Sequence, residues 1–314
     1  MVTRRTLLAA APAAAALAPL IGASAAFARE TAGDTGPFRF GVVADPQYAP
    51  VPPNLTSQRY YGNSLWKLSE AVAAFNERDD LAFVVTLGDI IDRHWESFSH
   101  ILPVYDSLKH QKHFVLGNHD FDVADDWLGS VVRTAGIPAA WYDFAVNGVR
   151  FVVLDGNDVS TFAPPEGDPR RALAEERLAA LKAKGAANAQ SWNGSLSDAQ
   201  LAWLEERMNA ARDAGERVIV LCHYPVYPAN EHNLWDSETL VALLTGYPNF
   251  VAWFNGHNHA GNYGVASGKH FLNFKGMVDT PDTSAYAIVS VHPDRIEIEG
   301  FGREEARVLS LSAS

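Results

Sequence analysis

Five short segments of the chain place metal-binding residue types directly after apolar runs. They are Asp45-Pro46-Gln47, Gly88-Asp89-Ile90-Ile91-Asp92, Gly117-Asn118-His119-Asp120, Cys222-His223 and Gly256-His257-Asn258-His259. The preceding runs are short and rich in Val, Ile and Phe, which is typical of strands buried on both faces. Side chains at the carboxyl ends of such strands face one crevice in α/β folds. The sequence therefore predicts that these distant segments converge on one site that binds two metal ions.

The apolar runs alternate with helix-like segments. Strands are predicted at 38–44, 81–87, 113–116, 151–154, 217–221 and 250–254. Helices are predicted after Asn63 or Ser64, either being a possible N-cap, from Asp168 to Lys184, and after Ser197, which forms a capping box with Gln200. The polar segment 160–195, which contains the second of these helices, is expected to be a surface excursion.

In the last part of the chain, strand-like segments follow one another without helix-like segments between them. Segments 265–274, 285–292 and 295–300 are predicted to be successive antiparallel strands, and Asn147-Gly148 is predicted to join 141–146 to the next strand by a tight turn. Together the elements predict an α/β (α+β-like) fold, in which a central mixed β-sheet sandwich is flanked by helices.

Residues 1–28 are predicted to be a signal peptide of the twin-arginine type. Arg4-Arg5 precede a weakly apolar, Ala-rich run, and Ala26-Phe27-Ala28 fits the pattern that signal peptidase reads. A Sec signal or an N-terminal anchor helix are the alternatives, although two prolines disfavour a stable membrane span. We therefore expect a periplasmic or extracellular protein, delivered by the twin-arginine export machinery. No transmembrane span is expected in its mature part, 29–314.

Charge and cysteine content exclude some classes of function. The formal net charge is −12, and removing Arg4 and Arg5 makes it −14. Such an acidic chain is not expected to coat nucleic acid. It has a single cysteine, Cys222, so no intramolecular disulfide can form. Cys222 is predicted to be an inert buried residue rather than a ligand or nucleophile.

The ordered motifs resemble those of the calcineurin-like metallophosphoesterase superfamily: D-x-H, G-D-x-x-D, G-N-H-D/E, a single His and G-H-x-H. Four of the five segments match, and Gln47 stands where the family usually has His. The resemblance implies one domain with the four-layer architecture of that family over residues 29–314. It also implies a dinuclear-metal hydrolase that cleaves phosphoanhydride or phosphodiester bonds.

The resemblance implies a role for each matched residue. The first metal would be held by Asp45, Gln47, Asp89 and His259. The second would be held by Asp89, Asn118, His223 and His257. A hydroxide bridging the metals would attack phosphorus, His119 would protonate the leaving oxygen, and Asp120 would orient His119. Asp92 is expected to support the Asp89 loop, with a solvated turn residue as the alternative.

Gln47 is the informative departure from the family pattern. A neutral amide oxygen replaces an imidazole, so the first metal site becomes rich in oxygen ligands. The alternative is that Gln47 lies behind the ligands without binding metal, and that the first site is weak. Oxygen ligands favour manganese, with iron, magnesium and zinc as alternatives.

The segments around Gln47 narrow the resemblance. Segments 44–48, 59–65, 222–225, 256–263 and 275–280 resemble those of the manganese-dependent ADP-ribose/CDP-alcohol diphosphatases. A small phosphorylated substrate derived from a nucleotide is therefore expected, such as a CDP-alcohol or ADP-ribose. Two alternatives remain: a broad exported phosphomonoesterase or phosphodiesterase that scavenges phosphate, and a catalytically inactive metal-containing protein that binds nucleotides.

Overall fold

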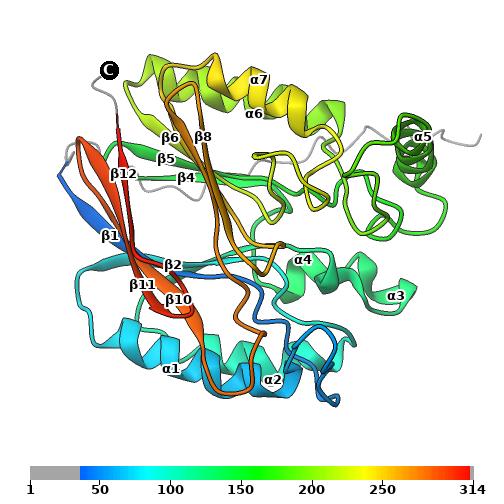
Figure 1. Cartoon of the computed structure of the whole chain (residues 1–314), viewed down its shortest axis with the longest axis horizontal. Coiled ribbons are helices and arrows are strands. Elements are labelled where there is room, and N and C mark those ends of the chain that lie inside the picture. The colour runs from blue at the N-terminus through cyan, green and yellow to red at the C-terminus, as the bar shows by residue number, and fades with distance from the viewer. Residues whose placement is uncertain (1–35, 312–314) are drawn as a thin grey trace, which may run out of the picture.

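Two six-stranded sheets pack face to face, and helices cover their outer sides (Figure 1). The computed structural model describes residues 36–311. The predicted signal peptide at 1–28 lies outside these residues and stays a prediction. Among the described residues, none of the helices combines the length and the apolar character that crossing a bilayer requires.

The first sheet has the strand order β12-β11-β10-β1-β2-β3. Its strands are β1 (Phe38–Val43), β2 (Leu81–Leu87), β3 (Gln111–Val115), β10 (Ala285–Val291), β11 (Arg295–Gly302) and β12 (Arg307–Ser310). Strands β1, β2 and β3 run parallel, whereas the three C-terminal strands are antiparallel. The outer side of the sheet carries α1 (Ser64–Asn76), α2 (Glu96–Tyr105), α3 (Asp125–Leu128) and α4 (Val131–Thr134).

The second sheet has the strand order β4-β5-β6-β7-β9-β8. Its strands are β4 (Tyr142–Val146), β5 (Val149–Val153), β6 (Arg217–Leu221), β7 (Phe250–Asn255), β8 (Asn262–Ala266) and β9 (Lys269–Asn273). Strands β5, β6, β7 and β9 run parallel. Its outer side packs against α6 (Asp198–Asp213) and α7 (Ser237–Thr245), while α5 (Pro169–Ala183) lies apart over a small cluster of its own.

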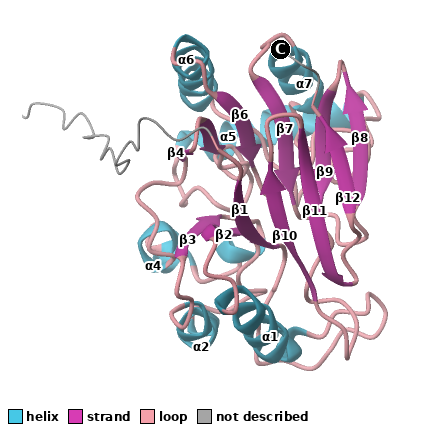
Figure 2. Cartoon of the chain, turned by 90° about the vertical axis from the view of Figure 1, so that its left-hand side faces the viewer, coloured by secondary structure: helices cyan, strands magenta, loops and turns pink. Residues whose placement is uncertain are grey.

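The main core lies between the two sheets. The rings of Phe40 and Phe83 stack with centroids 4.7 Å apart, and Phe151 of the other sheet meets Phe83 edge-on at 5.0 Å. Successive strand residues alternate between this core and the helix layer, as Phe83 and Val84 do. Both faces are buried, which explains the continuous apolar runs and confirms the predicted four-layer sandwich. Parallel strands in both sheets bring their carboxyl ends to one edge. Figure 2 shows the strands between α6 and α7 on one side and α1 and α2 on the other.

The structure corrects the prediction of a single strand over 265–274. Ser267 and Gly268 both adopt positive φ, 51° and 73°, and close a tight turn between the antiparallel strands β8 and β9. The predicted turn at Asn147-Gly148 is confirmed, with φ of 45° and 74°. Strand β12 and helices α2, α3, α4 and α7 were not predicted. None of these helices has a capping side chain at its start, and α2 contains Pro103.

The predicted helices start at the expected residues, but their capping hydrogen bonds are only partly those expected. Ser197 accepts a hydrogen bond from the Gln200 backbone N–H, as a capping box requires. The Gln200 side chain instead points inward and donates to the Asp155 carbonyl at 3.0 Å. At α1, Asn63 donates to the Pro281 carbonyl rather than capping the helix.

Candidate metal centre

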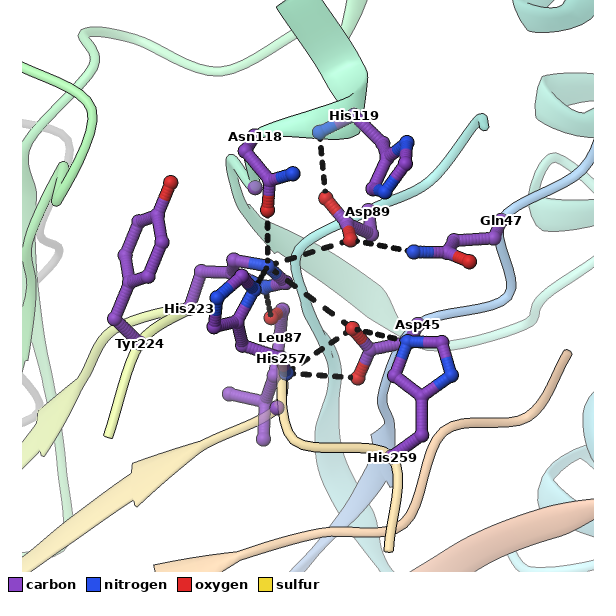
Figure 3. A network of polar contacts seen from close by, with 12 residues as sticks. Asp45, Gln47, Leu87, Asp89, Asn118, His119, His223, Tyr224, His257 and His259 are labelled. Atoms are coloured by element: carbon purple, nitrogen blue, oxygen red, sulfur yellow. Dashed lines mark hydrogen bonds and ion pairs between the residues drawn. The ribbon is translucent and has the colours of Figure 1, made fainter. Parts of the chain in front are cut away.

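The seven predicted ligands lie on loops that leave the carboxyl ends of five strands, and their side chains converge (Figure 3). All are buried except Asn118, which is half-buried. Four of them adopt left-handed backbone conformations, with φ of 46° at Asp45, 43° at Gln47, 52° at Asp89 and 69° at His257. Such strain in non-glycine residues clusters at functional sites, because the surrounding structure must enforce it.

Two groups of donor atoms share the Asp89 carboxylate. Asp89, His223 and His257 form one group, and Asp45, Asp89 and His259 form the other; the donor atoms of each group lie within 4.8 Å of one another. Asp89 Oδ2 is 3.4 Å from His223 Nε2, and Asp45 Oδ1 is 3.5 Å from His259 Nε2. Both groups consist of predicted ligands, and both contain Asp89.

The two predicted amide ligands, Gln47 and Asn118, lie beside these groups. Asn118 Oδ1 lies 3.2 Å from His223 Nε2, and Gln47 Nε2 donates to Asp89 Oδ2 at 2.8 Å. The other amide atom, Gln47 Oε1, is buried and finds no partner among residues 36–311. A buried acceptor without a donor is costly, and a cation would satisfy it. The donor set therefore fits two divalent cations.

Two histidines of this cluster have raised pKa values in the metal-free protein. Burial alone would lower the pKa of His223 and of His259, but the Asp89 and Asp45 carboxylates raise both pKa values to about 9. Burial also opposes the charge on Asp89, yet the charges of His223 and His119 hold the pKa of Asp89 below its ordinary value. Metal ligands must lose their protons, so metal binding is expected to displace them.

Gly117 makes room for the shared carboxylate. A Cβ atom at this position would lie 2.1 Å from Asp89 Oδ1 and 2.5 Å from the Asp89 backbone nitrogen. We expect Gly117→Ala to displace Asp89, to lower the unfolding free energy by about 1–3 kcal/mol, and to weaken metal binding. Thermal melting and the metal content of the purified protein measure the two effects.

Gly129→Ala is the matched control for this prediction, because no atom lies within 4 Å of a Cβ atom there and its φ is −66°. It should keep the wild-type melting temperature and metal content. Wild-type metal content in Gly117→Ala would show that the close approach at Gly117 does not position Asp89.

His119 is held beside the cluster by two contacts. Its backbone N–H donates to Asp89 Oδ1 at 2.9 Å, and its Nδ1 lies 3.0 Å from the Asp92 carbonyl and 3.4 Å from Asp92 Oδ1. Asp92 is fully buried, which contradicts the solvated-turn alternative.

The structure places Asp92 where Asp120 was expected to orient His119. The Asp120 carboxylate instead accepts from the backbone N–H groups of Gly117 at 2.8 Å and Ile91 at 3.2 Å. These two hydrogen bonds hold the Asp120 carboxylate against the loops that follow β3 and β2. Burial and the charge of Asp89 raise the pKa of Asp120 to about 8.

Each of the three histidines in the donor groups has a second partner behind it. His223 Nδ1 meets the Leu87 carbonyl at 2.8 Å, His259 Nδ1 meets Asp279 Oδ1 at 2.9 Å, and His257 Nε2 meets Asn193 Oδ1 at 3.0 Å. Sequence reasoning missed all three partners. Asn193 is fully buried, so the predicted surface excursion 160–195 in fact ends inside the protein.

His232 and Cys222 lie near the site but were not predicted to be ligands. His232, which matches no motif, lies with its ring centroid 5.5 Å from that of His257. Cys222 belongs to neither donor group, and burial raises the pKa of its thiol. Burial and a raised pKa favour the prediction that Cys222 is an inert residue.

Known proteins resemble this chain along most of its length. Manganese-dependent ADP-ribose/CDP-alcohol diphosphatases from Xenopus tropicalis and Homo sapiens are 29% and 27% identical to it, each match covering 87% of this chain and 94% and 92% of the relative. The crystal structure of a dimetal phosphatase from Danio rerio, 26% identical, superposes with a TM-score of 0.79 over 89% of this chain and 100% of that one. The family model for calcineurin-like phosphoesterases matches residues 38–261. The chain thus belongs to the calcineurin-like phosphoesterase family of phosphoric ester hydrolases.

Proposed function

We propose that this enzyme hydrolyses the diphosphate bond of nucleoside-diphosphate alcohols or sugars, such as CDP-alcohols and ADP-ribose, with Mn²⁺ as its preferred metal. The observation that carries the proposal is the Asp89 carboxylate shared by two donor groups at the strand ends. The names of the curated relatives supply the substrate class and the metal. These relatives match this chain over nearly their whole length, so the proposal concerns the entire domain.

The residues fall into two sets of four, with Asp89 in both. The first cation would be held by Asp45, Gln47, Asp89 and His259, and the second by Asp89, Asn118, His223 and His257. When bound, the two cations would neutralise the substrate phosphate and increase the acidity of the attacking water. The first set contains only one nitrogen ligand, which favours Mn²⁺ over Zn²⁺.

His119 is proposed as the proton donor to the leaving phosphate oxygen. Nδ1–H donates to the Asp92 carbonyl, so Nε2 of the protonated ring remains to deliver the proton. The Asp92 carboxylate, 3.4 Å from Nδ1, stabilises that charged ring. The water oxygen bonds to phosphorus, the bond from phosphorus to the bridging oxygen breaks, and that oxygen takes the proton from His119. Asp120 is proposed to hold the loop rather than to touch His119.

A substrate and metal screen of the full-length purified enzyme tests the proposal. With Mn²⁺ present, we expect kcat/KM on CDP-choline or ADP-ribose to exceed that on p-nitrophenyl phosphate and its bis-ester by at least about 10-fold, which corresponds to about 1.4 kcal/mol of additional transition-state binding. Replacing Mn²⁺ by Zn²⁺ should lower the activity. Mass spectrometry of the products identifies which bond breaks.

The same screen separates the alternatives. Equal or higher activity on the simple phosphate esters would contradict the proposal and favour a broad phosphate-scavenging esterase. Tight binding of nucleotide with no turnover of any substrate would favour a binding protein. A His119→Ala variant tests the proton donor, because its activity should fall more on CDP-choline than on a substrate whose leaving group needs no proton.

A further inference from the structure

We infer that Asn193 is a positioning residue that fixes the tautomer of His257 and so presents the Nδ1 lone pair of that imidazole to the second metal. The inference rests on the metal centre proposed above. It gives the segment 160–195 a function at the site, although this segment contains none of the predicted ligands.

The orientation of the Asn193 amide follows from its surroundings. Its Nδ2 donates to the Asn188 carbonyl at 3.1 Å and to the Glu231 carbonyl at 2.7 Å. Carbonyl oxygens can only accept, so the amino end of the amide must face them. The carbonyl end, Oδ1, is therefore the atom that lies 3.0 Å from His257 Nε2.

This orientation determines where His257 carries its proton. Asn193 Oδ1 is an acceptor, so His257 Nε2 must donate and its Nδ1 holds a lone pair. His257 Nδ1 lies 3.1 Å from His223 Nε2. His223 Nδ1 in turn faces the Leu87 carbonyl, which leaves a lone pair on Nε2 when that imidazole is neutral. Two lone pairs and the Asp89 carboxylate then face one point, where a cation satisfies all three.

Asn193 is held firmly enough to impose this choice. It is 0% exposed, and the two residues that follow it are held by backbone contacts. Ser195 pairs with Val159, and the Gly194 carbonyl accepts from the Trp235 backbone N–H at 2.9 Å. A Cβ atom at Gly194 would lie 2.3 Å from the Gly156 carbonyl oxygen, so the segment packs directly on the loop after β5.

The type of partner also distinguishes the two metal sites. His259 faces a carboxylate, Asp279, whereas His257 faces a neutral amide. A carboxylate behind a histidine raises the basicity of the ligand more than an amide does. Asn193 therefore fixes the orientation of His257 without adding negative charge to a site that already contains Asp89.

Calorimetric titration of the chelator-stripped, full-length protein with MnCl₂ tests the inference. Partners behind a ligand histidine typically change metal affinity by about 10- to 100-fold. We expect Asn193→Leu to weaken one of the two Mn²⁺ binding steps by about that factor and to leave the other within about 3-fold. Asn193→Asp, which keeps an acceptor facing His257, should retain tighter binding at that step than Asn193→Leu.

Asn188→Ala is the matched control. It removes the 2.7 Å bond from the Asn188 side chain to the Leu234 carbonyl, in the same segment, but leaves the acceptor of Asn193 in place. Both binding steps should stay near wild type. The inference is overturned if Asn193→Leu binds both ions like the wild type, or if it and Asn188→Ala lose affinity and melting temperature equally. Failure of the wild type to bind two ions would contradict the metal centre itself.

Discussion

Asp89→Asn is expected to lower kcat/KM on CDP-choline by about 1,000-fold or more, which corresponds to about 4 kcal/mol of transition-state stabilisation. Asp89 is the one residue that belongs to both donor groups. A neutral amide removes the negative charge shared by the two cations, so we also expect the bound Mn²⁺ to fall from two ions to at most one. Steady-state kinetics and elemental analysis of the purified variant measure these effects.

Asp89→Asn is expected to fold, so its loss of activity would report on the metal centre and not on unfolding. Asparagine has the shape of aspartate and tolerates the positive φ of 52° at this position. Asp213→Asn, on a side chain that is 71% exposed, is the control for removing one carboxylate and should change nothing. Two bound ions with near-wild-type kcat/KM in Asp89→Asn would show that the shared carboxylate is dispensable.

The strand-end motifs predicted that these side chains converge, because parallel strands bring their carboxyl ends together whatever separates them in the sequence. Their division into two sets that share Asp89 was implied by the family resemblance. His223 and Asp89 are far apart along the chain, yet β6 and β2 place them 3.4 Å from each other. The same runs, with the helix-like segments between them, predicted a sheet sandwich flanked by helices. The four-layer arrangement was implied by the family resemblance.

The partners behind the ligands could not be predicted in this way. Asn193 and Asp279 lie on loops, where neither helical nor strand periodicity fixes a direction for the side chain. Asp120 follows His119 directly in the sequence, but the backbone N–H groups of Gly117 and Ile91 compete for its carboxylate. The side chain that meets His119 comes from Asp92, on a different loop.

Lys67 is a buried cation, and helix periodicity places it on the buried face of α1. It lies on the same face of α1 as Ser64, Leu68 and Ala71, and all four are buried. Its ammonium group has three N–H donors and lies within hydrogen-bond distance of four successive carbonyl oxygens of the loop after β9. The distances are 2.9, 3.2, 2.7 and 2.6 Å to Met277, Val278, Asp279 and Thr280. Burial and the charge of Arg303 lower the pKa of Lys67 to about 8, so the group is still charged at pH 7.

Lys67→Met is expected to destabilise the protein by about 3 kcal/mol or more, because buried carbonyls that lose a charged donor cost about 1–3 kcal/mol each. In a domain of this size that loss lowers the melting temperature by roughly 6 °C or more. Methionine fills a similar volume, so the effect isolates the ammonium group from the packing of the stem. Thermal and urea unfolding of the metal-free protein measure it.

The same substitution is also expected to affect metal binding, because it alters the loop that carries Asp279. The loop that Lys67 holds carries the carboxylate behind His259, so we expect weaker Mn²⁺ binding at the first site in addition to the lower stability. Lys109→Met is the control, because that lysine is 62% exposed and donates to the single carbonyl of Asn76; its cost should stay within about 0.5 kcal/mol. If Lys67→Met melts at the wild-type temperature, the loop holds its shape without the ammonium group, and Asp279 must be positioned by its other neighbour, Arg303, 3.7 Å from the carboxylate.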